Sequence, residues 1–190
     1  MGEDSRGVTW EADKERILRT AVPYFEAGKE IVVVAHSYGG IPSTVAVQNQ
    51  EVAERSARGL KGGFRNIIFL AAFSIPVRGW DLITTFGEGG RQALYDDATE
   101  EESKRAFKLI TTHSQDAFET EVDFIPSDIT IPKSYIICEN DRVIPVAVQE
   151  QMINGTPGMK AHRLSAGHSP FLGRLKNTVD IVVSVINTDA

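Results

Sequence analysis

One serine in this chain stands in a setting that could make it a nucleophile. Ser37 lies in the segment "IVVVAHSYGG", where an uncharged run of mostly β-branched residues leads into a histidine, the serine, a tyrosine and two glycines. Small residues, Ala35 and Gly39, stand two positions before and after the serine. A tight turn from a strand into a helix strains the backbone of its central serine and requires small neighbours at these positions. The segment therefore predicts a turn that presents the Ser37 hydroxyl and directs the amide of Tyr38 toward a developing oxyanion.

A serine hydroxyl needs a base within hydrogen-bonding reach, and histidine is the most frequent one. The chain has four histidines. His168 is favoured, because it lies in "SAGHSPFLGRL" after a predicted strand, and open α/β sheets place their chemistry in loops at the carboxyl ends of strands. His36 adjoins the serine and is expected to point into the scaffold. His113 and His162 are expected to have surface or half-buried roles.

The carboxylate that orients the base is expected in a loop after another strand. Asp141 follows the apolar run "KSYIIC" within "ENDRVIP". Its competitors are Glu139, which is expected to form part of the turn, and Asp128, which precedes the strand. The order Ser37, Asp141, His168 along the chain is the order that a nucleophile turn on an α/β sheet requires. These three residues are therefore the predicted catalytic triad.

A parallel sheet is needed to bring these loops together. Strands are predicted over residues 30–35, 65–73, 133–138 and 159–165, and helices over 10–26, 41–55, 146–153 and 170–186. Strands that alternate with helices indicate parallel pairing and an α/β sandwich. Ile31–Val34 reads as a strand buried on both faces. Pro23 predicts a kink or a break in the first helix.

Residues 80–122 interrupt this alternation and are predicted to form a short helical lid, with a plain surface excursion as the alternative. Thr99 and Glu102 have the spacing of a capping box, ahead of an apolar face formed by Phe107 and Ile110. Four phenylalanines are candidates for lining an apolar ligand pocket, although core packing is the alternative for at least two of them; they are Phe73, Phe86, Phe107 and Phe118.

Length and composition restrict the class of protein. A chain of 190 residues is expected to form a single domain, residues 1–190. Its net charge of −6 offers no basic stripe to neutralise phosphates, which argues against a nucleic-acid partner. Cys138 lies in an apolar run and is expected to be a buried hydrophobe. With no apolar segment of about 18 residues and no apolar signal core, the prediction is a cytoplasmic, soluble enzyme without membrane contact, cofactor or metal.

Three segments together, "VVVAHSYGG", "CENDRVIPVAVQEQM" and "SAGHSPFLGRL", resemble the α/β-hydrolase superfamily. More narrowly, they resemble small fungal and bacterial esterases related to plant methyl esterases and hydroxynitrile lyases. The resemblance implies an α/β-hydrolase-type parallel sheet sandwiched by helices. It also implies that Ser37 is the nucleophile, His168 the general base and acid, Asp141 its orienter and Tyr38 an oxyanion donor. The implied reaction is cleavage of a small apolar carboxylic ester or lactone through an acyl-enzyme.

The chain departs from that family at its beginning. Such proteins normally start with strands and a His-Gly loop that donates an oxyanion amide, and no counterpart precedes the turn here, so N-terminal strands are expected to be missing. This predicts an exposed apolar edge at Ile31–Ala35, and a chain that forms a homodimer through this edge, aggregates or is poorly active unless the edge is covered. Two other functions stay open: a non-hydrolytic lyase or cyclase with the same pocket, and a catalytically weak homologue that acts as a binding protein. Against the lyase, Ser169 stands where such lyases are expected to carry a lysine.

Overall fold

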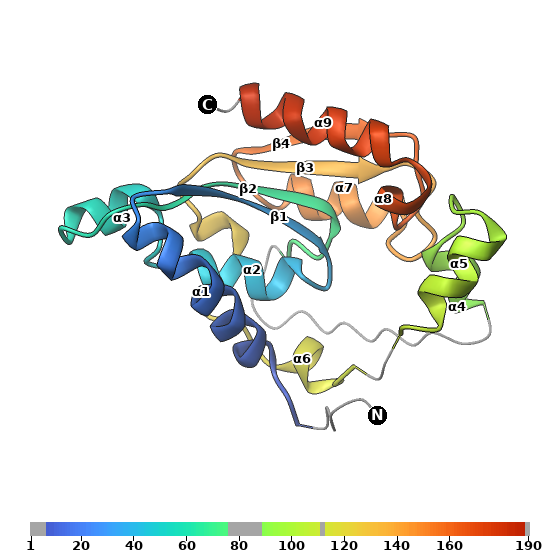
Figure 1. Ribbon diagram of the computed structural model, residues 1–190, viewed down its shortest axis with the longest axis horizontal. Helices are drawn as coiled ribbons and strands as arrows, with labels where there is room; N and C mark the ends of the chain where they lie inside the picture. Colours follow the sequence, from blue (N-terminus) through green and yellow to red (C-terminus); the bar gives the residue numbers. More distant parts are fainter. Residues whose placement is uncertain (1–6, 76–88, 111–112, 189–190) are drawn as a thin grey trace.

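The protein is described by a computed structural model, which places residues 7–75, 89–110 and 113–188. Four parallel strands form one sheet in the order β1-β2-β3-β4 (Figure 1). Their bounds are β1 Glu30–Ser37, β2 Gly63–Ala72, β3 Lys133–Cys138 and β4 Met159–Leu164. The predicted parallel α/β sheet is confirmed, and each predicted strand lies within two residues of its observed bounds.

Helices cover both faces of this sheet. Their bounds are α1 Trp10–Glu26, α2 Gly40–Val47, α3 Val52–Ala57, α4 Gly90–Leu94, α5 Glu100–Phe107, α6 Asp116–Glu119, the 3-10 turn η1 Pro126–Asp128, α7 Val146–Asn154, α8 Pro170–Gly173 and α9 Leu175–Thr188. Figure 1 shows α9 on one face and α1, α2 and α7 on the other. None of the described helices is long and apolar enough to cross a membrane.

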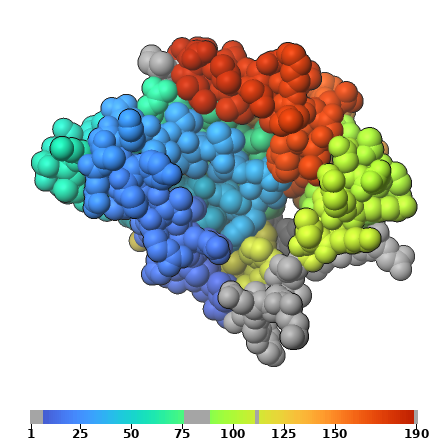
Figure 2. Space-filling model, viewed as in Figure 1, coloured from blue at the N-terminus to red at the C-terminus, as the bar shows by residue number. Residues whose placement is uncertain are grey.

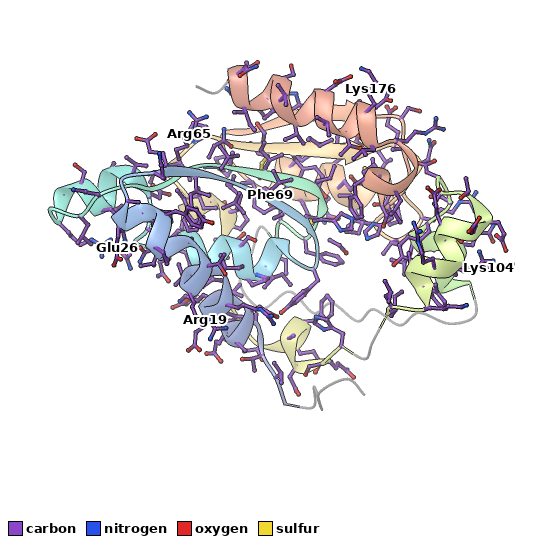
Figure 3. The ribbon with its side chains drawn as sticks, in the orientation of Figure 1. Arg19, Glu26, Arg65, Phe69, Lys104 and Lys176 are labelled. Atoms are coloured by element: carbon purple, nitrogen blue, oxygen red, sulfur yellow. The ribbon has the colours of Figure 1, made fainter. Side chains whose placement is uncertain are left out.

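Each face of the sheet has its own hydrophobic core. The larger core joins the sheet to α1, α2 and α7 through residues such as Phe25, Val45 and Met152. The smaller core joins it to α9 through Ile68 and Val185. Figure 3 shows the labelled Phe69 within the body of the fold, whereas the labelled Lys104 and Lys176 lie at its surface. The central strands are buried on both faces because helices cover both, which explains why β2 and β3 read as nearly continuous apolar runs.

β1 differs from the central strands. Within the described residues it pairs only with β2, so it forms an edge of the sheet. Ala35 is its one buried residue, and Val34 is 45% exposed. The prediction of a strand buried on both faces was therefore wrong, because an apolar run does not reveal which of its sides has a neighbour. The predicted exposed apolar edge is present among the described residues.

Two predicted helices are each divided in two. The predicted helix 41–55 ends at Val47, and Asn49 in the connection to α3 has a positive φ of 61°, which a continuing helix cannot accommodate. The predicted helix 170–186 is interrupted at Arg174, between α8 and α9. Conversely, Pro23 does not break α1, which runs continuously from Trp10 to Glu26. Pro23 lies near the carboxyl end of that helix, where one missing amide donor costs little continuity.

The middle of the chain contributes α4, α5 and α6, while part of the predicted lid, including Phe86, lies outside the described residues. The capping box at the start of α5 is confirmed by reciprocal hydrogen bonds between Thr99 and Glu102. The predicted apolar face is exposed, since Phe107 and Ile110 are 37% and 44% accessible. Figure 2 shows α4 and α5 beside the C-terminal segment.

Candidate active site

Ser37 occupies a strained turn at the carboxyl end of β1. Its φ of 51° lies in the left-handed region, which non-glycine residues seldom adopt. The turn is held by hydrogen bonds from Gly39 N to His36 O (2.9 Å) and from Phe73 N to Ser37 O (3.0 Å). A Cβ atom on Gly40 would lie 2.3 Å from the carbonyl oxygen of Phe73, so glycine is required there. The sequence forms this turn because its small residues allow α2 to start directly against the end of β2.

His168 meets Ser37 from the other edge of the sheet. It lies in the loop between β4 and α8, and its side chain is completely buried. Its Nε2 atom is 3.0 Å from Ser37 Oγ, and its Nδ1 atom is 2.9 Å from Asp141 Oδ2. A carboxylate accepts hydrogen bonds, so Nδ1 carries the proton and Nε2 is the acceptor that faces the serine hydroxyl. This tautomer is the one that a general base needs.

Asp141 is held in place by its own loop. Its Oδ1 atom accepts the amide hydrogens of Val143 (2.7 Å) and Ile144 (2.9 Å), which leaves Oδ2 for His168. The acid and base loops are also joined through their backbones, from Glu139 N to Leu164 O (3.0 Å) and from Asn140 N to Ala166 O (2.9 Å). The carboxylate therefore has a fixed orientation toward the imidazole.

The competing candidates lie in other surroundings. Glu139 is 3.6 Å from Arg163 in a partly exposed ion pair. Asp128 accepts a hydrogen bond from the Ile125 amide and so caps η1. His162 belongs to β4, within the strand rather than in the loop that follows it. The structure thus brings together Ser37, Asp141 and His168, whereas Glu139, Asp128 and His162 lie in the other settings just described.

An aromatic group lies on the other side of the turn. The Tyr38 ring packs against His113 (4.3 Å between centroids) and Phe118 (4.9 Å). Phe118 also contacts Phe73 edge to face, with 6.0 Å between ring centroids. Phe73 belongs to the larger hydrophobic core, and Phe118 packs against that core. Two of the predicted ligand-lining phenylalanines are thus explained by core packing. Phe107 is exposed on α5.

Tyr38 is fixed at both its side chain and its backbone. Its hydroxyl donates a hydrogen bond to Asp13 of α1 (2.8 Å), and burial together with this bond raises the Tyr38 pKa well above its usual value. The next amides along the turn are engaged, Gly39 N with His36 O and Ile41 N with Tyr38 O. The Tyr38 amide precedes α2 directly after the nucleophile, which is the position expected of an oxyanion donor. The part played by Asp13 could not be read from the sequence, because nothing local links it to Tyr38.

A contact from the middle segment also reaches the base loop. The amide of Gly167 donates a hydrogen bond to the Asp97 carboxylate. A Cβ atom on Gly167 would lie 1.8 Å from Asp96 Oδ1, so the two segments are closely packed. Burial, with the nearby charge of Asp97, raises the pKa of Asp96. This contact could not be predicted from local sequence, since its partners are 70 residues apart.

The described residues contain no group of three or more histidine, cysteine or acidic side chains arranged to hold a metal ion. Cys138 is buried, as expected, and burial followed by the charge of Asp141 raises its pKa to about 12. A thiol with so high a pKa holds its proton at neutral pH and is a poor nucleophile. Of Ser37 and Cys138, Ser37 is therefore the better candidate for a nucleophile.

The sheet order, the strained turn and the Ser37–His168–Asp141 contacts agree with a comparison against protein families. A model described as the alpha/beta hydrolase family matches residues 1–181. The chain belongs to this family.

Curated relatives and solved structures extend this result. The chain is similar to the alpha/beta hydrolase nvfD of Aspergillus novofumigatus, with 25% identity over 96% of this chain and 78% of the relative. It is also similar to a probable hydrolase of a Phoma species, with 26% identity over 93% and 78%. Among solved structures, a methylesterase from Arabidopsis has a TM-score of 0.71 at 18% identity over 92% of this chain and 76% of that one. Polyneuridine aldehyde esterase has a TM-score of 0.70 at 16% identity over 93% and 79%. These structures support the α/β-hydrolase fold.

Proposed function

We propose that the protein is a serine hydrolase that cleaves a small apolar carboxylic ester or lactone through an acyl-enzyme. The observation that carries the proposal is the continuous chain of contacts from Ser37 Oγ through His168 to Asp141, with separations of 3.0 and 2.9 Å. All three side chains lie at or just after the carboxyl ends of parallel strands, where α/β folds place their chemistry.

Acylation begins when Ser37 Oγ attacks the ester carbonyl carbon while His168 Nε2 accepts the hydroxyl proton. The imidazolium that forms is stabilised by Asp141, whose negative charge lies 2.9 Å from Nδ1. The carbonyl oxygen becomes negatively charged in the tetrahedral intermediate, and the Tyr38 amide is the donor proposed to bind it. Collapse of this intermediate breaks the ester C–O bond, and His168 returns the proton to the departing alkoxide.

Deacylation repeats these steps with water. His168 Nε2 removes a proton from the water molecule as it attacks the acyl carbon, and a second tetrahedral intermediate forms. Its collapse releases the carboxylic acid and returns the proton to Ser37 Oγ. A lactone follows the same path, except that its alcohol and acid stay in one molecule.

The comparisons favour an ester among possible substrates. Two solved structures with the same fold are described as a methylesterase and as polyneuridine aldehyde esterase, and the fungal relatives are described as hydrolases. Identities of 16–26% do not transfer a particular substrate. The two esterase structures support esters as the first class of substrate to test.

The test uses a fluorophosphonate probe, which phosphonylates an activated serine, together with a simple aryl ester. The wild-type chain is expected to label at Ser37 and to turn over the ester. Ser37→Ala should lose labelling and at least about 10⁴-fold in kcat. Ser184→Ala, on the exposed side of α9, is the matched control and should behave as the wild type.

A folded wild-type chain that neither labels nor hydrolyses aryl esters would contradict the proposal and favour a binding protein. Labelling at Ser37 without ester turnover would favour non-hydrolytic chemistry in the same pocket. The mass of the labelled tryptic peptide identifies the modified residue.

A further inference from the structure

We propose that His36 is a positioning residue that fixes the general base against the nucleophile turn by donating a hydrogen bond to the main-chain carbonyl of His168. This inference rests on the proposed function, because it concerns the same site. His36 adjoins Ser37 in the chain, and neither the fold nor the mechanism of a Ser-His-Asp site requires a histidine there.

His168 is held by two consecutive residues, His36 and Ser37. His36 Nε2 is 2.7 Å from His168 O, while the adjacent Ser37 Oγ is 3.0 Å from His168 Nε2. Successive side chains of a regular strand point to opposite faces, which would keep two neighbours from sharing one partner. The positive φ of Ser37 ends that alternation at the turn. Two consecutive residues thereby hold the backbone and the side chain of the base.

The hydrogen bond has one possible direction. A carbonyl oxygen only accepts, so His36 Nε2 carries the hydrogen and donates it. Burial, and secondarily the nearby His168, lowers the pKa of His36 from 6.5 to about 4, so the ring stays neutral at the pH at which an imidazole base works. A neutral donor can lie beside His168 without opposing the positive charge that forms there during proton transfer. A lysine or arginine at this position would oppose that charge.

Ring packing accompanies the hydrogen bond. The His36 ring lies 4.8 Å from the His168 ring and 4.9 Å from Phe171, with an edge-to-face angle of 89° to the latter. A phenylalanine at position 36 can fill this space but has no hydrogen to donate. A glutamine has an amide N–H at a similar reach and can donate it. A comparison of the phenylalanine and glutamine variants therefore separates the effect of ring packing from that of the hydrogen bond.

The experiment compares His36→Phe, His36→Gln and, as a remote control, His162→Phe on β4. Aryl-ester kinetics and the fluorophosphonate labelling rate are measured, and the fraction of molecules that finally label is counted by mass spectrometry. His36→Phe should lower kcat and the labelling rate by about 10–100-fold, as expected when a base is displaced by a fraction of an ångström to about 1 Å. KM and the final labelled fraction should stay near wild type. His36→Gln should recover most of the lost rate, and His162→Phe should keep all of it.

Several results would overturn the inference. A His36→Phe variant that labels as fast as the wild type would contradict it. So would a loss of rate in this variant that a smaller labelled fraction explains completely, because misfolding would then be its cause. A His36→Gln variant no faster than His36→Phe would also contradict it. ¹⁵N spectra give a readout that needs no activity: His36 should keep its Nε2–H form from neutral pH to about pH 5, and a bare Nε2 would refute the donor role. A wild type that fails to label at Ser37 would refute the proposed function instead, leaving that spectrum to decide the hydrogen bond.

Discussion

The candidate site has two halves: the Ser37 turn, called the nucleophile half, and the loops of Asp141 and His168, called the acid–base half. Different physical interactions hold the two halves in place. Asp141 is buried, and its carboxylate accepts three hydrogen bonds from its own loop and from His168. It follows β3, which is buried throughout. Ser37 instead is the last residue of β1, an edge strand with an exposed Val34, and is held in a strained backbone conformation. Satisfied polar groups fix the acid, whereas steric constraint and contacts from distant segments fix the nucleophile.

The largest expected effect is in the acid–base half. Asp141→Asn keeps an oxygen for the amides of Val143 and Ile144, which turns the new amide nitrogen toward His168. Nδ1 must then accept a hydrogen bond, so the proton moves to Nε2 and the base cannot accept from Ser37. We expect kcat to fall by about 10³–10⁴-fold, or about 4–5.5 kcal/mol in the activation barrier.

Glu139→Gln is the matched control, because Glu139 lies on the same turn and is partly exposed. It should retain kcat within about two-fold, as surface substitutions commonly do. Equal losses in the two variants would show that the turn, and not the tautomer of His168, was disturbed. Aryl-ester kinetics at saturating substrate make the comparison.

The second prediction concerns His36, which joins the two halves. Its pKa is lowered from 6.5 to about 4 in the folded chain, so between these values the unfolded chain binds a proton that the folded chain does not. Stability from this group is therefore complete above pH 6.5 and declines as the pH falls toward 4. The loss at pH 4 amounts to about 3 kcal/mol in the free energy of unfolding.

Urea unfolding at a series of pH values from 4 to 7 measures this slope. His36→Phe and His36→Gln both lack the titrating group, so each should show a shallower acid decline than the wild type. The glutamine variant is expected to keep most of the wild-type kcat, whereas the phenylalanine variant should keep about 1–10% of it. If both variants follow the wild-type slope, His36 titrates alike in the folded and unfolded chains and is not buried as a neutral ring.

Much of the geometry of the candidate site was predictable from local sequence. The small residues around Ser37, and the placement of Asp141 and His168 directly after apolar runs, are features of short segments. Parallel strands align their carboxyl ends, so the three loops had to meet at one end of the sheet. The fold class followed from the same alternation of strands and helices.

The parts that were not predictable depend on contacts between distant segments. The breaks after α2 and between α8 and α9 need φ and ψ values that an apolar periodicity does not report. The Asp97 contact with Gly167 and the Asp13 contact with Tyr38 join residues without any local pattern in common. The apolar run at Ile31–Val34 indicated a strand correctly, but not that one side lacks a described neighbour.

The two edges of the sheet lead to the last prediction, which has the smallest expected effect. β4 carries Lys160 and Arg163, and charged side chains of this kind discourage pairing with another sheet. β1 has no charged residue from Ile31 to Ala35. A groove of about 530 Å³ lies between α1 and β1, lined largely by apolar side chains such as Ile17 and Val33. An edge of this kind favours association, and the homodimer expected from the sequence stays a prediction.

Val34→Lys places a charge on the β1 edge, and Val183→Lys on α9 is the matched control, because the two valines are 45% and 48% exposed. If two copies pair through β1, Val34→Lys should raise the dimer dissociation constant by about ten-fold or more, equivalent to about 1.4 kcal/mol. Val183→Lys should leave it unchanged, since both variants add the same net charge. Light scattering across a concentration series measures the constant. A monomeric wild type at high concentration, or equal behaviour of the two variants, would exclude β1 as the interface.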